Sequence, residues 1–169
     1  MMPSREDVAI SACVFLGASV FSTGLVHSKE PFIQIERIEN CIRFSEDRYQ
    51  CIGSAAGACS DLPSGGSIEG MLTCSSLERA YWLKHGEESL MAILKVAAAS
   101  DSSRFSQPDF SSLEIGIKEM QAGWIKFRDA LCKTKNHSVT EGSLRTNYCL
   151  MQQDGEQALY LLWLSEQHF

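Results

Sequence analysis

The sequence predicts an all-α protein: a small antiparallel helical bundle that carries disulfides and has short helices at its N-terminal end. Three observations support this class. Apolar residues recur at spacings of three and four in several long segments. Alternating runs and Asn-Gly hairpin turns, which predict strands, are nearly absent. The 169 residues include seven cysteines, a content typical of exported, disulfide-braced domains.

The N-terminal part predicts two short helices. Pro31 precedes a stretch in which Ile35, Ile38 and Ile42 are spaced as on one helical face. Between Cys51 and Cys59 the chain has mostly small residues, which suit a second short helix. A Pro-Ser-Gly-Gly run over residues 62–67 then predicts a loop.

Three longer helices are expected to form the bundle. Ser67 is a candidate N-cap for a helix that runs to about Ala99, although Gly86 weakens its middle. A polar linker over residues 100–108 separates it from a helix over 109–133, and a last helix covers 144–167 with a weak point at Gly155. The helix over 109–133 carries an apolar stripe that we expect to face the core, formed by Ile117, Met120, Trp124, Phe127 and Leu131.

The cysteines indicate disulfides rather than a metal site. Cys13 lies in the first apolar run, which leaves six: Cys41, Cys51, Cys59, Cys74, Cys132 and Cys149. Six cysteines can pair in many ways, and spacing alone does not choose among them. In one helix the Cα atoms of Cys51 and Cys59 would be about 12 Å apart, beyond disulfide reach. We therefore favour sequential pairing: 41 with 51, 59 with 74, and 132 with 149. There is no Cys-x-x-Cys motif and no ligand-like histidine spacing, so we expect no metal and no redox site.

The first residues predict export. The run from Val8 to Val26 is apolar, and small residues before position 29 allow cleavage after Ser28. We expect residues 1–28 to be a signal peptide and residues 29–169 to be the helical domain, in the periplasm or secreted. Arg5 is the only basic residue before the run, which leaves two alternatives: an uncleaved membrane anchor or a buried helix of a cytosolic protein. A lipoprotein site at Cys13 is rejected, because the apolar residues follow that cysteine.

Charge and motifs exclude several functions. The net charge of −6 and the pI of about 5.2 argue against a nucleic-acid partner and suit a cationic protein partner. No serine lies in a Gly-x-Ser-x-Gly elbow, and no glycine-rich phosphate loop follows a strand. Surface charge explains carboxylate pairs such as Glu87 and Glu88. We therefore expect no enzyme activity, no cofactor and no small-molecule substrate.

Arg128 and Asp129 form the most unusual polar pair of the sequence. Arg128 shares a helical face with Trp124 and Cys132. It could contact a partner, but we favour a structural role, with its stem over Trp124 and its guanidinium paired with a carboxylate or a helix C-terminus. Asp129 is expected to bridge to another helix or to a loop N–H. The three tryptophans, Trp82, Trp124 and Trp163, are interpreted as core residues.

The segment around this pair resembles a known family. Its motif comprises Gln121, Trp124, Phe127, Arg128, Asp129 and Cys132, followed by Cys149. It is similar to the core motif of the lysozyme inhibitor LprI N-terminal family, small helical proteins of the bacterial envelope. The similarity covers roughly residues 41–164, and residues 51–59, Gly70, Met71, Cys74, Glu78 and Trp82 look like the N-terminal extension of one branch of that family.

The resemblance implies that the protein binds and occludes a lysozyme-type muramidase. The sequence departs from the family pattern after Trp82, where Leu-Lys-His-Gly-Glu-Glu-Ser replaces Asp-x-x-Leu-Asn-x-x-Tyr, and at residues 153–156, where Gln-Asp-Gly-Glu replaces Thr-x-x-Arg. If those positions shape the inhibitory surface, this chain keeps the fold and loses the activity. The alternative is therefore a disulfide-braced interaction domain of the periplasm with an unrelated protein partner.

Overall fold

The computed structural model describes residues 31–104, 111–135 and 142–167, and this part of the chain is helical, with loops and no strands. The all-α prediction is confirmed. The elements are the helices α1 (Ile35–Phe44), α2 (Ser54–Ser60), α3 (Ile68–Arg104), α4 (Leu113–Lys133) and α5 (Gly142–Glu166), and the short 3-10 helix η1 (Arg48–Cys51). The expected signal peptide, the cleavage site after Ser28 and Cys13 lie outside the described residues.

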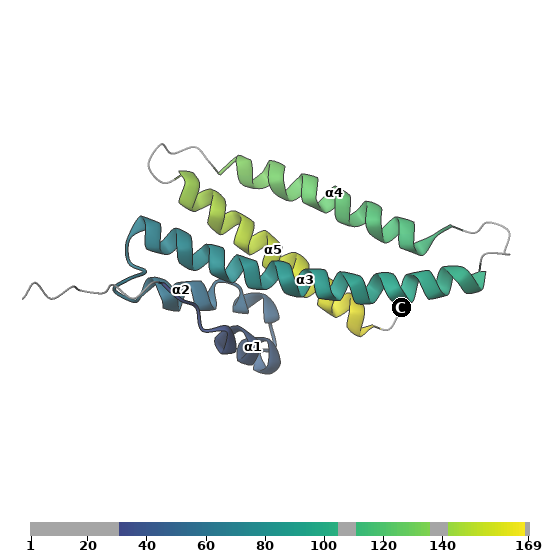
Figure 1. Cartoon of the computed structure of the whole chain (residues 1–169), viewed down its shortest axis with the longest axis horizontal. Helices are drawn as coiled ribbons and strands as arrows, with labels where there is room; N and C mark the ends of the chain where they lie inside the picture. Colours follow the sequence, from purple (N-terminus) through teal and green to yellow (C-terminus); the bar gives the residue numbers. More distant parts are fainter. Residues whose placement is uncertain (1–30, 105–110, 136–141, 168–169) are drawn as a thin grey trace, which may run out of the picture.

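Helices α3, α4 and α5 form the bundle. α4 runs antiparallel to both of the others, and α5 packs along α3 (Figure 1). The short elements α1, η1 and α2 lie on the side of α3 away from α4 (Figure 1). The long helix therefore has α4 on one side and a disulfide-rich cap on the other.

The helix limits follow from local capping. Ser67 caps α3 as expected, since its Oγ accepts from the N–H of Gly70 at 3.0 Å. α4 begins at Leu113, four residues after the predicted start at Asp109, because Ser112 is its N-cap and accepts from the N–H of Ile115 at 3.1 Å. Asp101 at the end of α3 supports this cap, and a hydrogen bond from Ser112 lowers the pKa of its carboxyl.

The buried residues form two clusters. The larger one joins the cap to α3 and α5 and includes Ile38, Ala55, Ala56, Trp82, Met151 and Leu159. The smaller one joins the far half of α3 to α4 and α5 through Ile93, Ala97, Ile117 and Leu161. Trp82 is thus a core residue, as predicted, whereas Trp163 is 50% exposed and its interpretation as a core anchor was wrong.

The predicted stripe of α4 is only partly correct. Ile117 is buried, and Met120, Trp124 and Leu131 are half-buried, but Phe127 is 58% exposed. The rotation of α4 is fixed by Arg128 and Cys132, which must reach partners on α5. Because Phe127 lies about 100° around the helix from Arg128, it turns toward solvent.

The described residues contain three disulfides, in the sequential order that we favoured. Cys41 is bonded to Cys51, Cys59 to Cys74, and Cys132 to Cys149. The first closes the turn between α1 and η1, the second ties α2 to α3, and the third ties α4 to α5. Each closes a loop of 10 to 17 residues, so each should stabilise the fold by roughly 2–4 kcal/mol.

Two glycines of α3, Gly70 and Gly86, differ in the space that is available for a side chain. A Cβ on Gly70 would lie 2.6 Å from the carbonyl oxygen of Ser64, so the loop before α3 packs directly on this helix. A Cβ on Gly86 would meet nothing closer than 3.5 Å, on Ala158. Helix α3 is continuous through Gly86 despite the unfavourable propensity of glycine.

Alanine substitutions at these two glycines should therefore change stability in opposite directions. We expect Gly86→Ala to raise the free energy of unfolding by about 0.5–1 kcal/mol, because alanine has the better helix propensity. We expect Gly70→Ala to lower it by about 1–3 kcal/mol, because backbone must move. Urea unfolding of both variants checks this, and a loss of stability in Gly86→Ala would contradict it.

Candidate functional site

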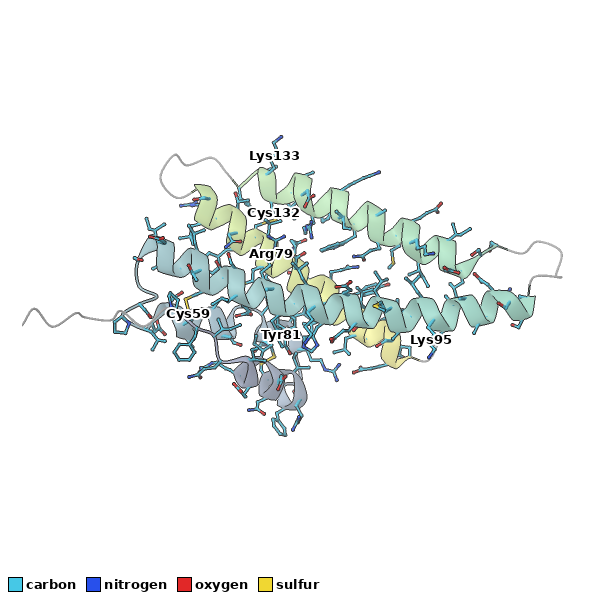
Figure 2. The ribbon with its side chains drawn as sticks, viewed as in Figure 1. Cys59, Arg79, Tyr81, Lys95, Cys132 and Lys133 are labelled. Atoms are coloured by element: carbon cyan, nitrogen blue, oxygen red, sulfur yellow. A yellow bond between two sulfur atoms is a disulfide. The ribbon has the colours of Figure 1, made fainter. Side chains whose placement is uncertain are left out.

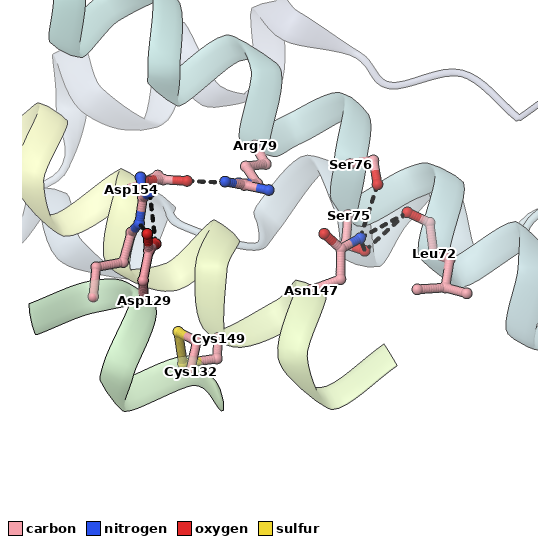
Figure 3. A network of polar contacts seen from close by, with 10 residues as sticks. Leu72, Ser75, Ser76, Arg79, Asp129, Cys132, Asn147, Cys149 and Asp154 are labelled. Atoms are coloured by element: carbon pink, nitrogen blue, oxygen red, sulfur yellow. Dashed lines mark hydrogen bonds and ion pairs between the residues drawn. A yellow bond between two sulfur atoms is a disulfide. The ribbon is translucent and has the colours of Figure 1, made fainter. Parts of the chain in front are cut away.

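A buried ionic clamp joins the three bundle helices. The side chain of Asp154 on α5 is inaccessible to solvent. One of its carboxylate oxygens accepts from Arg79 Nε of α3 at 2.6 Å, and the other accepts from Arg128 Nη1 of α4 at 2.7 Å. Figure 3 shows Asp154 facing Arg79 across the interface between α5 and α3. One carboxylate therefore holds two guanidinium groups from two different helices.

Arg128 has the structural role that we favoured. Its guanidinium carbon lies 5.1 Å from the ring centre of Trp124, and only 12% of its side chain is exposed. Burial acts to lower the pKa of Arg128, but its hydrogen bonds to Asp154 and Asp129 outweigh burial and raise it. The guanidinium of Arg128 is thus held in its charged form by the two carboxylates.

Asp129 does not have the role that we predicted. We expected it to bridge to another helix or to a loop N–H, but its Oδ1 accepts from Arg128 Nε and Nη2 at 2.9 and 2.7 Å. Its side chain is 58% exposed, because it points to the solvent side of α4. Asp129 therefore binds the Arg128 guanidinium from the solvent side, while Asp154 binds it from the buried side.

Half of the six motif residues on α4 are bonded directly to α5. Gln121 accepts a hydrogen bond from Gln157 Nε2 at 2.8 Å, and Cys132 is bonded to Cys149. Together with the Arg128–Asp154 pair, these contacts are spaced along the inner face of α4. Phe127 is the motif residue with no part in this attachment, and it presents an aromatic side chain to solvent.

A second polar contact fixes α5 on α3. Asn147 Nδ2 lies within hydrogen-bond distance of the carbonyl oxygen of Leu72 and the hydroxyls of Ser75 and Ser76, at 3.0, 2.9 and 2.8 Å. Figure 3 shows these partners on neighbouring turns of α3. Ser75 is fully buried, so the amide satisfies a hydroxyl that solvent does not reach.

Glu78 performs the corresponding role for the disulfide-rich cap. It is fully buried, yet its carboxylate accepts from the N–H groups of Gly53 and Ala56, both at 2.6 Å, and from Trp82 Nε1 at 3.0 Å. These N–H groups lie at the start of α2, where a helix favours negative charge. Gly53 has a positive φ of 89°, which a glycine adopts without strain.

Tyr81 lies on the same side of α3 and is packed against Trp82, edge to face, with ring centres 5.2 Å apart. Figure 2 shows it on the face of α3 toward α1, whereas Arg79 lies on the face toward α4. Burial, followed by Glu39, Glu88 and Glu78, raises the pKa of Tyr81 to about 12. Its hydroxyl therefore stays protonated and has no role as a base.

The clamp borders a groove of about 310 Å³ between α3, α4 and α5. Its walls include the apolar side chains of Leu83, Leu90, Trp124 and Ile125, and its polar groups are Arg128 and Asp154 of the clamp, the Gln121–Gln157 pair and the exposed Glu87. The clamp and the glutamine pair bond internally, so the groove offers mainly apolar surface with one exposed carboxylate at Glu87.

In residues 31–104, 111–135 and 142–167, no three or more His, Cys, Asp or Glu side chains are grouped as metal ligands would be. In the same ranges, no helix combines the length and the apolar character that crossing a bilayer requires.

Sequence reasoning named Arg128 but missed its partners. Asp154 appeared only as a departure from the family pattern, and Arg79 was not singled out. A signal for Asp154 exists: it lies on the helical face of Met151, Ala158 and Leu161, all of which are buried. A carboxylate in a buried stripe requires a cation or several hydrogen-bond donors as partners.

The described part of the chain is thus a disulfide-braced helical bundle whose polar side chains clamp helices together. The model of the family "Lysozyme inhibitor LprI" matches residues 59–161, more than half of the chain, and the protein belongs to this family. The match spans α3, α4 and most of α5, including every residue of the clamp. No curated protein and no solved structure gives a significant match.

Proposed function

We propose that this protein is exported and binds a lysozyme-type muramidase, which it inhibits by occluding the enzyme. The observation that carries the proposal is the family match over residues 59–161, which includes α3, α4, most of α5, the clamp and two of the disulfides. The acidic net charge of −6 supports it, because it would speed encounter with a basic enzyme. A protein partner is supported by the family itself, which is named for a lysozyme inhibitor.

Export is part of this proposal. Three disulfides in the described residues need an oxidising compartment to form. We propose that residues 1–28 are the signal peptide and that the domain over residues 29–169 acts in the periplasm or outside the cell.

The proposed role is inhibition without catalysis. The family is named for an inhibitor, and the buried titratable groups serve the fold: Asp154 and Arg128 are paired, Glu78 caps α2, and Tyr81 is held neutral. Their hydrogen-bonding capacity is used inside the protein, which suits a rigid binding domain.

Inhibition of muramidase activity tests the proposal. We expect the oxidised domain over residues 29–169, at micromolar concentration, to slow the lysis of peptidoglycan by at least one lysozyme type. The reduced and alkylated domain is the control and should not inhibit, because removal of the disulfides destabilises the fold. A lack of inhibition against several lysozyme types would contradict the proposal. Crosslinking in the native host would then identify the unrelated partner of the alternative function.

A further inference from the structure

A second hollow lies on the far side of the molecule from the clamp, between η1 and the C-terminal half of α5. It has a volume of about 530 Å³ and is lined mainly by aromatic and acidic side chains, together with Arg48 and Leu159. We call its five exposed residues the aromatic–acidic patch: Glu46, Asp47, Tyr49, Tyr160 and Trp163. The patch has no part in the ionic clamp or in the family motif.

The aromatic residues of the patch are not core residues. Tyr49, Tyr160 and Trp163 are 51%, 39% and 50% exposed. The rings of Tyr160 and Trp163 lie side by side, with centres 6.0 Å apart and planes tilted by 32°. Tyrosine and tryptophan are the residue types that contribute most to protein–protein binding, because they bury large areas with little loss of freedom.

The charge of the patch is negative. The hollow is also lined by one cation, Arg48, whose guanidinium is paired with both carboxylate oxygens of Glu166 at 3.0 and 3.1 Å. The charges of Arg48 and Glu166 cancel each other, so the hollow keeps the negative charges of Glu46 and Asp47 beside the aromatic rings. A cation that enters the hollow would meet ring faces and carboxylates together, a combination that binds lysine or arginine side chains.

The patch is also held in place before any partner arrives. Asp47 is the N-cap of η1 and accepts from the N–H of Tyr49 at 3.0 Å. The Cys41–Cys51 disulfide closes the segment, and the Arg48–Glu166 pair ties η1 to α5. Binding would therefore require little ordering of the backbone, which favours affinity.

Most of the patch lies outside the family match. Glu46, Asp47 and Tyr49 precede residue 59, and Trp163 follows residue 161. The aromatic–acidic patch is therefore not accounted for by the matched part of the family, and it adds a surface to the common bundle.

We propose that the aromatic–acidic patch is the docking surface for a basic protein, which inserts a lysine or arginine side chain between the aromatic rings and the carboxylates. The proposal rests on the proposed function in one respect: it identifies that basic protein with the muramidase. It assigns the contact to η1 and α5 rather than to the groove beside α4.

Binding measurements on surface variants test the patch. Titration calorimetry of the oxidised domain with a c-type lysozyme should show at least about tenfold weaker binding for Trp163→Ala. Glu46→Lys should weaken binding and reduce its dependence on salt, because it removes charge complementarity. The matched control is Phe127→Ala, which removes an equally exposed aromatic residue on α4 and should leave the dissociation constant unchanged. Circular dichroism would verify that each variant folds.

The outcomes separate this inference from the proposed function. If lysozyme binds and only Phe127→Ala weakens the binding, the patch is not the docking surface, but the inhibitor function stands. If lysozyme does not bind but the basic protein cytochrome c does, with loss in Trp163→Ala, the patch stands and the muramidase identity is wrong. Binding of neither protein overturns the patch. Binding of N-acetylglucosamine oligomers that depends on Trp163, with no binding of lysozyme or cytochrome c, would also refute the docking surface, because the patch would then be a glycan site.

Discussion

Replacing Asp154 with asparagine is expected to lower the free energy of unfolding by about 3 kcal/mol. The substitution keeps the shape of the side chain but removes the charge that holds Arg79 and Arg128. Loss of one partner in a buried ion pair typically costs about 3–5 kcal/mol, because the other charge stays buried without compensation. The lower end applies here, since 26% of the Arg79 side chain reaches solvent. Urea unfolding of the oxidised protein measures the change.

Asp129→Asn is the matched control for this prediction. It removes the other carboxylate of Arg128, but from a side chain that is 58% exposed. Exposed ion pairs contribute about 0–1 kcal/mol, so this variant should unfold close to the wild type. Equal losses in the two variants would show that Arg128 is stabilised from the solvent side and would refute a buried clamp.

The sequence predicted the helices well, because their signals are local. Helical spacing, the Ser67 cap and the Pro-Ser-Gly-Gly loop all act within a few residues, and they placed the ends of α3 and α5 within about five residues. The disulfide pairing followed for a similar reason. Each bond joins cysteines on either side of one turn, which is the sequential order that we favoured among the many possible pairings.

The site was predicted less completely, because it depends on contacts between distant parts of the chain. Arg128 pairs with a residue 26 positions away, and Asp154 pairs with Arg79 across 75 positions. A motif names the residues but does not show their partners. Gln121 and Cys132 could be placed on a face of α4, yet only the packed helices show that this face is turned toward α5.

Phe127 illustrates how a regular pattern can mislead. Its spacing from Trp124 and Leu131 fits a core stripe, but hydrophobic spacing alone does not fix the rotation of a helix. In α4 the disulfide at Cys132 and the ion pair of Arg128 fix that rotation, and both outweigh the burial of one aromatic ring. The same reasoning applies to Trp163 on α5, which continues an apolar run and yet faces solvent.

Two buried acidic residues join different parts of the fold. Asp154 joins the bundle helices, and Glu78 joins the bundle to the disulfide-rich cap. Three of the five patch residues, Glu46, Asp47 and Tyr49, lie in η1 or just before it, so the position of the patch depends on Glu78 through α2. A change at Glu78 should therefore affect the cap more than the far end of the bundle.

Replacing Glu78 with glutamine is expected to lower the free energy of unfolding by about 3 kcal/mol. The carboxylate accepts from Gly53, Ala56 and Trp82 without solvent contact. Hydrogen bonds to a buried charge contribute about 1.5–3 kcal/mol, and the amide of glutamine would place a donor against a backbone N–H. Hydrogen exchange at the Ala56 amide should also speed up, because its acceptor is weakened or lost.

Glu88→Gln is the matched control on the same helix. Glu88 is 57% exposed and lies 3.9 and 3.8 Å from Lys84 and His85, so its loss should cost less than about 0.5 kcal/mol. Exchange in α5 near Asp154 should remain slow in Glu78→Gln if the two acidic residues act on separate parts of the fold. If Glu78→Gln unfolds like Glu88→Gln, with unchanged exchange at Ala56, then the disulfides alone hold the cap and Glu78 does not.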